Sequence, residues 1–172
     1  FSDNSAITRL LVHENLRVRY RAAMAVSKIG NGSDVDAVVK MLTENADADP
    51  IVRHGGIMAL NGIYLRDVDD GAEQVSNLVK HESPSVRIAL CVAMRKLLLS
   101  NEPQATNGKP QAAAVVGRLL DDRDLKIVLE AARVVHDVDV QSQMAKLAGL
   151  AERIDEFVSS DALIRRIVSA NV

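Results

Sequence analysis

The residues best suited to chemistry are four histidines and a single cysteine: His13, His54, His81, His136 and Cys91. Metal sites use such side chains at short spacings, and neither Cys-x-x-Cys nor His-x-x-x-His occurs. One cysteine cannot form an intrachain disulfide, and there is no Cys-x-x-Cys-His run to attach a haem. We therefore expect structural histidines near helix C-termini, with no metal and no cofactor in this segment.

Carboxylates gather in two short runs, at residues 67–70 and 121–124. Turns and helix caps account for both runs, whereas a calcium loop needs alternate oxygen ligands followed by a glutamate. The glycines match no phosphate-binding loop, and no serine and histidine combine into a known nucleophile motif. We therefore predict that this segment is not an enzyme, with no catalytic residues.

The charge balance and the low aromatic content restrict the kinds of partner that the chain can bind. The chain has 172 residues with 21 Lys and Arg against 23 Asp and Glu, and aromatic residues make up only 2%. Nucleic-acid binding needs a basic track or stacking aromatics, so we expect none; the cluster Arg17, Arg19 and Arg21 is interpreted as a solvated face. No apolar run is long enough to span a bilayer, which predicts no membrane insertion by this segment.

An internal repeat organises the chain. An aliphatic residue recurs at Val18, Val52, Val86, Ile127 and Ile164, and arginine follows it in all but the fourth case. The spacings, about 34, 34, 41 and 37 residues, are typical of two-helix repeat units. Three residues before each aliphatic residue is a side chain that can cap a helix: Asn15, Asp49, Ser83, Asp124 and Asp161.

Apolar residues also recur at helical spacing, and no stretch alternates as a strand would. The stripe after the first cap is Val18, Ala22, Ala25, Val26 and Ile29. We predict an all-α fold, a right-handed α-α superhelix (a solenoid of the HEAT or armadillo type) in a single domain. Its five two-helix repeats lie near residues 2–30, 33–65, 70–100, 110–136 and 140–172.

The first helices of these pairs are expected near 2–13, 33–45, 70–81, 110–121 and 140–157. The second helices are expected near 15–29, 49–65, 83–100, 124–136 and 161–172. Residues 101–109 are expected to form an exposed irregular loop, since they contain proline, glycine and asparagine.

The pattern resembles HEAT-like repeats of the PBS-lyase type. Asp49-Pro50-Ile51-Val52-Arg53 and Ser83-Pro84-Ser85-Val86-Arg87 carry the resemblance best. Residues 124–133 and 163–166 are similar to a narrower group, the repeat segment of large exported bacterial proteins. In those proteins a dehydrogenase-like propeller precedes the repeats and a c-type haem domain follows. That second resemblance implies a fragment of a multidomain dehydrogenase in the periplasm or at the membrane.

A docking surface follows from the phase of the repeats. Second helices line the concave face in HEAT-like proteins, and positions two, six and nine after each key aliphatic residue point away from the stripe. We expect a groove with an apolar middle and polar ends, formed by Tyr20, Met24, His54, Met58, Asn61, Ile88, Val92, Arg95, Leu129, Arg133 and His136. The alternative is that the apolar members pack against neighbouring repeats or a flanking domain.

Two functions are therefore open. The first is a non-catalytic interaction scaffold that binds a protein partner, or adjoining domains of the same chain, through its concave face. The second is a helical spacer between the propeller and haem domains of a dehydrogenase. The full parent sequence would separate them.

Two structural expectations accompany these functions. Arg19, Arg53 and Arg87 should form a ladder along successive second helices, with Glu14, Asp49 and Glu82 as nearby carboxylates. Apolar surface should be exposed at one or both ends of the chain, as a domain junction or a site of self-association. The terminal helices offer Ile7, Leu10, Leu11, Leu163, Ile164, Ile167 and Val168 for it.

Overall fold

The computed structural model describes residues 4–171, and it contains helices and turns but no strand within that range. The predicted all-α fold is therefore confirmed. The predicted helix ends at residues 2, 3 and 172 lie outside the described residues.

One set of helices forms a first layer. In chain order its members are α1 (Ser5–Thr8), η1 (Arg9–Val12), η2 (Gly32–Asp34), α3 (Val35–Asn45), α5 (Asp70–Asn77), η3 (Leu78–Lys80), α8 (Lys109–Leu119), α10 (Gln141–Gly149) and η4 (Leu150–Phe157). Four of the five expected first helices thus contain a 3-10 segment, where a tighter turn replaces the α-helical one.

The second layer holds the longer helices. They are α2 (Leu16–Ile29), α4 (Pro50–Arg66), α6 (Pro84–Leu99), α9 (Leu125–Asp137) and α11 (Asp161–Ser169). The bounds of each helix lie within three residues of the predicted ones. The segment expected to be an irregular loop instead contains a short helix, α7 (Pro103–Thr106), which begins at a proline.

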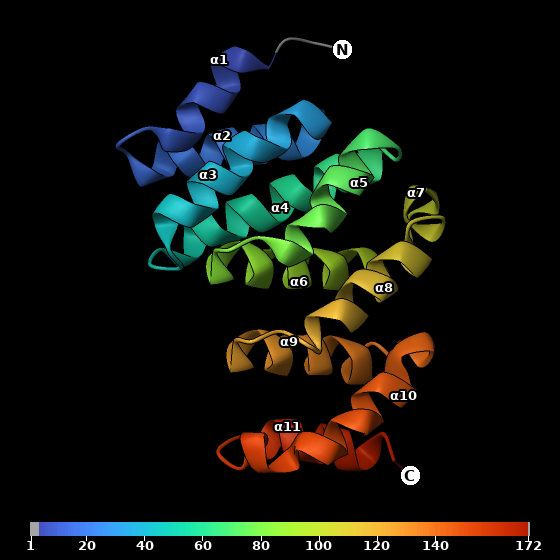
Figure 1. Ribbon diagram of the computed structural model, residues 1–172. Helices are drawn as coiled ribbons and strands as arrows, with labels where there is room; N and C mark the ends of the chain where they lie inside the picture. Colours follow the sequence, from blue (N-terminus) through green and yellow to red (C-terminus); the bar gives the residue numbers. More distant parts are fainter. Residues whose placement is uncertain (1–3, 172) are drawn as a thin grey trace.

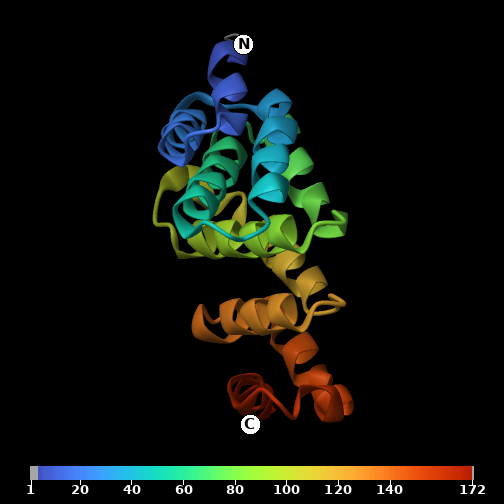
Figure 2. The ribbon, with the colours of Figure 1, turned by 90° about the vertical axis from the view of Figure 1, so that its left-hand side faces the viewer.

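The two layers stack in chain order. In the second layer α2 packs on α4, α4 on α6, α6 on α9, and α9 on α11. Extensive contacts join only elements of one helix pair or of two consecutive pairs. In Figure 1 the first layer faces the viewer and the chain ends lie at opposite ends of the stack, and Figure 2 shows the layers side by side.

Cap residues start the second-layer helices much as expected. The side chains of Asn15, Asp49 and Asp124 accept hydrogen bonds from backbone N–H groups of the first turn. Two expected caps differ. Ser83 occupies the cap position, but its hydroxyl pairs with Ser85 at 2.8 Å, and Asp161 is the first residue of α11, one position after the N-cap.

The core between the layers is aliphatic. The positions of α6 that correspond to the apolar stripe predicted for the first unit are all fully buried: Val86, Leu90, Ala93, Met94 and Leu97. In α2 the stripe is partly wrong, because Ile29 is 43% exposed. Ala23 is buried in its place, on the side of α2 that packs against Gly55 of α4.

The key arginines anchor the turns that precede their helices. Arg19 donates to the carbonyl of His13, and Arg87 donates to the carbonyl of His81. The Nδ1 atoms of the two histidines accept from the backbone N–H of Asn15 and Ser83. His13 and His81 are therefore structural, but as hydrogen-bond acceptors rather than as positive charges at a helix end.

The prediction of which carboxylates lie near the three arginines is wrong. Arg19 pairs with Glu44 at 3.6 Å, Arg53 with Asp47 at 2.7 Å and Arg87 with Asp122 at 2.7 Å. Asp49 is used as a helix cap, and Glu82 contributes its backbone carbonyl to Arg87 instead of its carboxylate. Each arginine is thus tied to a turn. The pairs of Arg19 and Arg87 join consecutive units, whereas the pair of Arg53 lies within one unit.

The ends of the stack are partly apolar. Leu10 is 41% exposed and Val168 is 53% exposed, as expected of terminal residues without a neighbour. Leu11, Leu163 and Ile167 are instead fully buried, so the expectation is wrong for these three residues. The short N-terminal helices pack on α2, and α11 packs on α9 and α10.

Candidate functional site

A groove runs along the outer side of the second layer. Three depressions of about 470, 390 and 480 Å³ share lining residues, and together they are called the long groove here. Val92 and Arg95 belong to the first and second depressions, and Asn61, Leu65 and Lys96 to the second and third. The long groove therefore crosses α4 and α6 from the middle of α9 to α7, and its third depression also reaches Ser27 of α2.

Most of the predicted docking residues meet in the long groove. Its first depression contains His54, Ile88, Val92, Arg95 and Arg133, and its third contains Met58 and Asn61. These seven come from α4, α6 and α9, as the repeat phase predicted. Asn61 is only 5% exposed, because its amide donates to the Ala93 carbonyl and holds α4 against α6.

The other predicted residues lie outside this lining. Tyr20 lies beside the first depression, since its ring is 6.5 Å from the ring of His54, but it does not line the depression. Met24 and Leu129 are half-buried and line none of the depressions of the long groove. His136 lines a separate depression near the C-terminus.

Seven lining residues important for charge or packing were not predicted to belong to the groove: Arg53, Ile57, Leu65, Arg66, Lys96, Glu102 and Glu130. Ile57 and Lys96 lie next to predicted positions on their helices, so a wider arc on the helical wheel would have found them. Glu102 follows α6, where its N–H donates to Ser100, and no helical periodicity could have placed it.

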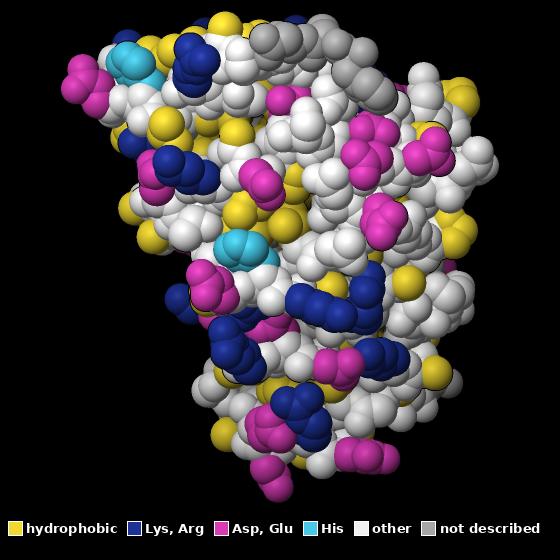
Figure 3. Space-filling model, turned by 45° about the horizontal axis from the view of Figure 1, so that its top comes forward, with side chains coloured by type: hydrophobic (Ala, Val, Ile, Leu, Met, Phe, Trp, Pro, Cys, Tyr) yellow, Lys and Arg dark blue, Asp and Glu magenta, His cyan; other side chains and the backbone are white. Residues whose placement is uncertain are grey.

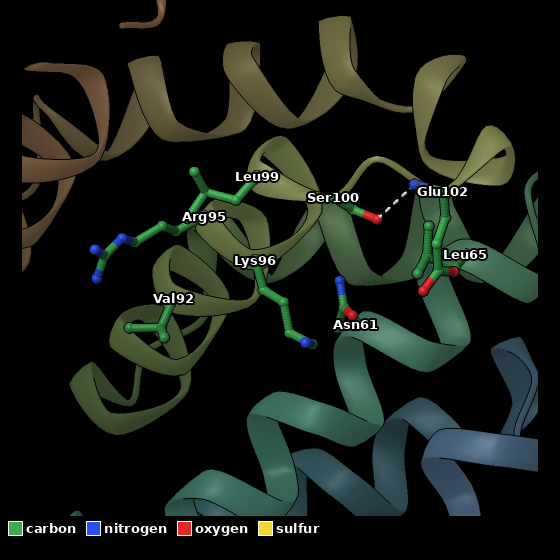
Figure 4. A pocket seen from close by; sticks show the side chains of 8 residues that line it. All are labelled: Asn61, Leu65, Val92, Arg95, Lys96, Leu99, Ser100 and Glu102. Atoms are coloured by element: carbon green, nitrogen blue, oxygen red, sulfur yellow. Dashed lines mark hydrogen bonds between the residues drawn. The ribbon is translucent and has the colours of Figure 1, made fainter. Parts of the chain in front are cut away.

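Figure 4 shows the middle of the long groove. Arg95 and Val92 project from α6 toward one side, while Lys96 from α6 and Asn61 from α4 point into the same depression. Glu102 closes the far side near Leu65. The lining of this depression combines the apolar side chains of Leu65, Val92 and Leu99 with the charged ones of Arg95, Lys96 and Glu102.

The cations of the long groove differ in how far they are neutralised. Arg53 pairs with Asp47, and Arg133 lies 3.7 Å from both Glu130 and Asp137. No ion pair within residues 4–171 involves Arg66, Arg95 or Lys96. The side chain of Arg66 donates only to backbone carbonyls, so its charge remains uncompensated.

Arg95 is the most unusual of these groups. Its Nε atom is buried and has no hydrogen-bond partner among the described residues. A buried N–H without a partner costs about 1–3 kcal/mol, more for a charged group. This cost is internal to the fold, because the buried Nε is closed to solvent, and only the terminal nitrogens of Arg95 can meet a ligand.

A serine, a histidine and an aspartate meet outside the long groove. Ser169 Oγ lies 3.1 Å from His136 Nε2, and His136 Nδ1 lies 3.0 Å from Asp137 Oδ1. Sequence motifs missed this trio because the serine is 33 residues from the histidine. Acyl transfer also needs donors for an oxyanion, but Ser169 ends α11, where helix carbonyls carry partial negative charge. We interpret the trio as a network that docks α11 on α9.

Asp137 is the centre of that network. The Arg166 guanidinium donates two hydrogen bonds at 3.1 Å, and these, with a smaller effect of His136, lower the pKa of Asp137 to about 2. Because the pKa of Asp137 is lowered in the folded state, its ionised carboxylate stabilises the fold at pH values above its ordinary pKa of about 3.9. This contribution is lost as the pH falls from there toward 2, and at 36% exposure it amounts to about 0–1 kcal/mol.

We expect Arg166→Gln to raise the midpoint of the Asp137 carboxyl titration toward 3.9, measured by NMR. Arg165→Gln is the matched control, since Arg165 is exposed beside the same depression and makes no ion pair among the described residues. An unchanged midpoint in Arg166→Gln would show that Arg166 does not hold the carboxylate in solution.

Other reactive groups are sparse. Within residues 4–171, no three His, Cys, Asp or Glu side chains converge as metal ligands would. Cys91 is fully buried, and burial raises the pKa of its thiol, so the thiolate that would react is disfavoured. No described helix combines the length and the apolar character that crossing a bilayer requires.

Fold and groove together define an all-helical protein with two stacked layers and a charged surface groove. No family model matches the chain, and no curated protein matches it. Two crystal structures of engineered proteins from the Northeast Structural Genomics Consortium align with it. The first has a TM-score of 0.49 at 20% identity, over 99% of this chain and 79% of its own. The second has a TM-score of 0.38 at 21% identity, over 99% and 70%.

Proposed function

We propose that this chain is a non-catalytic scaffold that binds a protein partner in the long groove. In this proposal the stacked helix pairs are five HEAT-like repeats of a right-handed solenoid, and the second layer is its concave face. A fold alone does not identify a binding partner, since one fold serves many functions. The residues of the long groove carry the proposal.

One observation supports it above the others. Seven residues selected only by their phase in the repeat line one continuous groove on three consecutive helices. Repeat proteins use such extended surfaces for recognition, because neighbouring units present equivalent positions side by side. A merely structural surface gives no reason for apolar side chains to remain accessible between charged ones.

The opposite face offers a contrast. Figure 3 shows the first layer and the N-terminal end, where acidic and basic side chains lie among polar and hydrophobic ones. Such a mixed surface is typical of solvated faces. The second layer is therefore the better candidate for a partner.

Met58→Glu is the variant that tests the groove. Met58 is half-buried in the third depression, so a carboxylate there should reach water and leave the fold intact while it disfavours an apolar contact. We expect the affinity for a fluorescein-labelled peptide selected on the chain by phage display, measured by fluorescence polarisation, to weaken about tenfold. The melting temperature should change little.

The matched control is Met144→Glu. Met144 is also half-buried, but it belongs to α10 of the first layer. Its substitution should leave peptide binding unchanged. If Met58→Glu unfolds the chain, residue 58 belongs to the core and the long groove is not the binding surface.

A further inference from the structure

We infer that the occupant of the long groove is an acidic peptide segment with an apolar anchor residue. The anchor lies over Ile57, Ile88 and Val92, and flanking carboxylates reach Arg95 and Lys96. This inference rests on the proposed function, because it names the chemistry of the partner that the groove receives.

The charge of the lining is the first argument. The whole chain has a formal net charge of −2, yet the long groove contains five cationic side chains, Arg53, Arg66, Arg95, Lys96 and Arg133, and only two carboxylates. Arg66, Arg95 and Lys96 have no carboxylate partner among residues 4–171. A local excess opposite in sign to the chain selects an anionic ligand.

Arg95 supplies the second argument. Arginine binds carboxylates through two parallel N–H···O bonds, often from Nε and a terminal nitrogen. In this structure Nε is buried and unpartnered, so the half-buried side chain offers its terminal nitrogens to a ligand. They make no ion pair among the described residues, so a carboxylate that enters the groove can pair with them without displacing a protein carboxylate. Lys96 is the next residue and is exposed, which provides a second contact for a neighbouring acidic side chain.

The floor decides between kinds of anion. Ile57, Ile88 and Val92 line the first depression together with Arg53, His54 and Arg95, so an apolar side chain fits there beside the carboxylates. Nucleic acid fits poorly, because none of the residues that line the three depressions is Phe, Tyr or Trp, the side chains best suited to base stacking. Glu102 and Glu130 in the lining would also repel a continuous phosphate track.

The experiment is selection of phage-displayed random dodecapeptides on the full chain. We expect the enriched peptides to contain two or more Asp or Glu around an apolar residue. The best peptide, fluorescein-labelled, should bind Arg95→Glu at least about tenfold more weakly than the original chain. Its affinity should also fall as salt is raised.

Arg118→Glu is the matched control, because Arg118 is exposed on α8 in the first layer and makes no ion pair among the described residues. It should bind the peptide as the original chain does. The buried Cys91 thiol reports the fold: it should react with a thiol reagent only after unfolding, in Arg95→Glu as in the original chain.

The outcomes separate the two proposals. If enriched peptides lack acidic residues but lose affinity in Met58→Glu, the groove binds peptides and the acidic partner is wrong. If neither Met58→Glu nor Arg95→Glu weakens any selected peptide, both proposals fall. Equal binding of single-stranded oligothymidine, or self-association abolished by Arg95→Glu, would replace the peptide with nucleic acid or a second copy.

Discussion

Asp122→Ala is expected to lower the free energy of unfolding by about 3–5 kcal/mol, as is typical when one partner of a buried ion pair is removed. Two oxygens of Asp122 accept from Arg87 at 2.7 and 3.0 Å, and the two side chains are only 5% and 4% exposed. Without the carboxylate, the buried guanidinium retains its charge and loses its counterion. The loss should be measured by urea denaturation.

Two comparisons isolate the cause. Asp47→Ala removes the partner of Arg53, a pair that is about 40% exposed, and should cost only about 0–1 kcal/mol. Asp122→Asn keeps an oxygen for the Asp124 N–H and removes the charge, so its effect should be intermediate. Equal losses for Asp122→Ala and Asp47→Ala would show that burial of the Arg87 pair has no energetic consequence.

This pair also shows where sequence reasoning succeeds and where it stops. The phase of Arg87 was visible because it repeats with its cap and its aliphatic neighbour. Its partner was not visible, because Asp122 lies 35 residues away in a turn of the next unit. Local signals such as caps and apolar stripes act within one helix, whereas a partner depends on how two units pack.

The candidate site divides in the same way. His54, Ile88, Val92 and Arg95 could be predicted, since each occupies an equivalent position of its repeat. Glu102 could not, because it belongs to a connection outside the repeat. The depth of Asn61 was also unpredictable, since it depends on the close approach of α4 to α6 through the Ala93 carbonyl.

Gly62→Ala is the other substitution with a large expected effect. Alanine in a helix interior is normally favoured over glycine by about 1 kcal/mol. Here, however, an added Cβ would lie 2.0 Å from the backbone oxygen of Ser27 and 2.8 Å from its Cα. Backbone atoms of α2 cannot turn aside as a flexible side chain does, so the two helices must separate.

We therefore expect Gly62→Ala to lower the free energy of unfolding by about 1–3 kcal/mol, the usual cost of overpacking. The matched control is Gly149→Ala near the end of α10, where an added Cβ meets no atom within 4 Å. That variant should be neutral or slightly stabilising. A gain in stability for Gly62→Ala, measured by thermal denaturation, would contradict the close contact of α2 with α4.

The same substitution connects packing with binding. Ser27, Met58 and Gly62 line the third depression of the long groove, so a shift of α2 away from α4 changes its shape. Arg66 donates to carbonyls of Ser27, Gly30 and Gly62, and separation of the helices would stretch this clamp. Gly62→Ala should thus weaken peptide binding as well as the fold, whereas Met58→Glu should weaken binding alone. Loss of binding in both variants with loss of stability only in Gly62→Ala is the result that includes the third depression of the long groove in the docking surface.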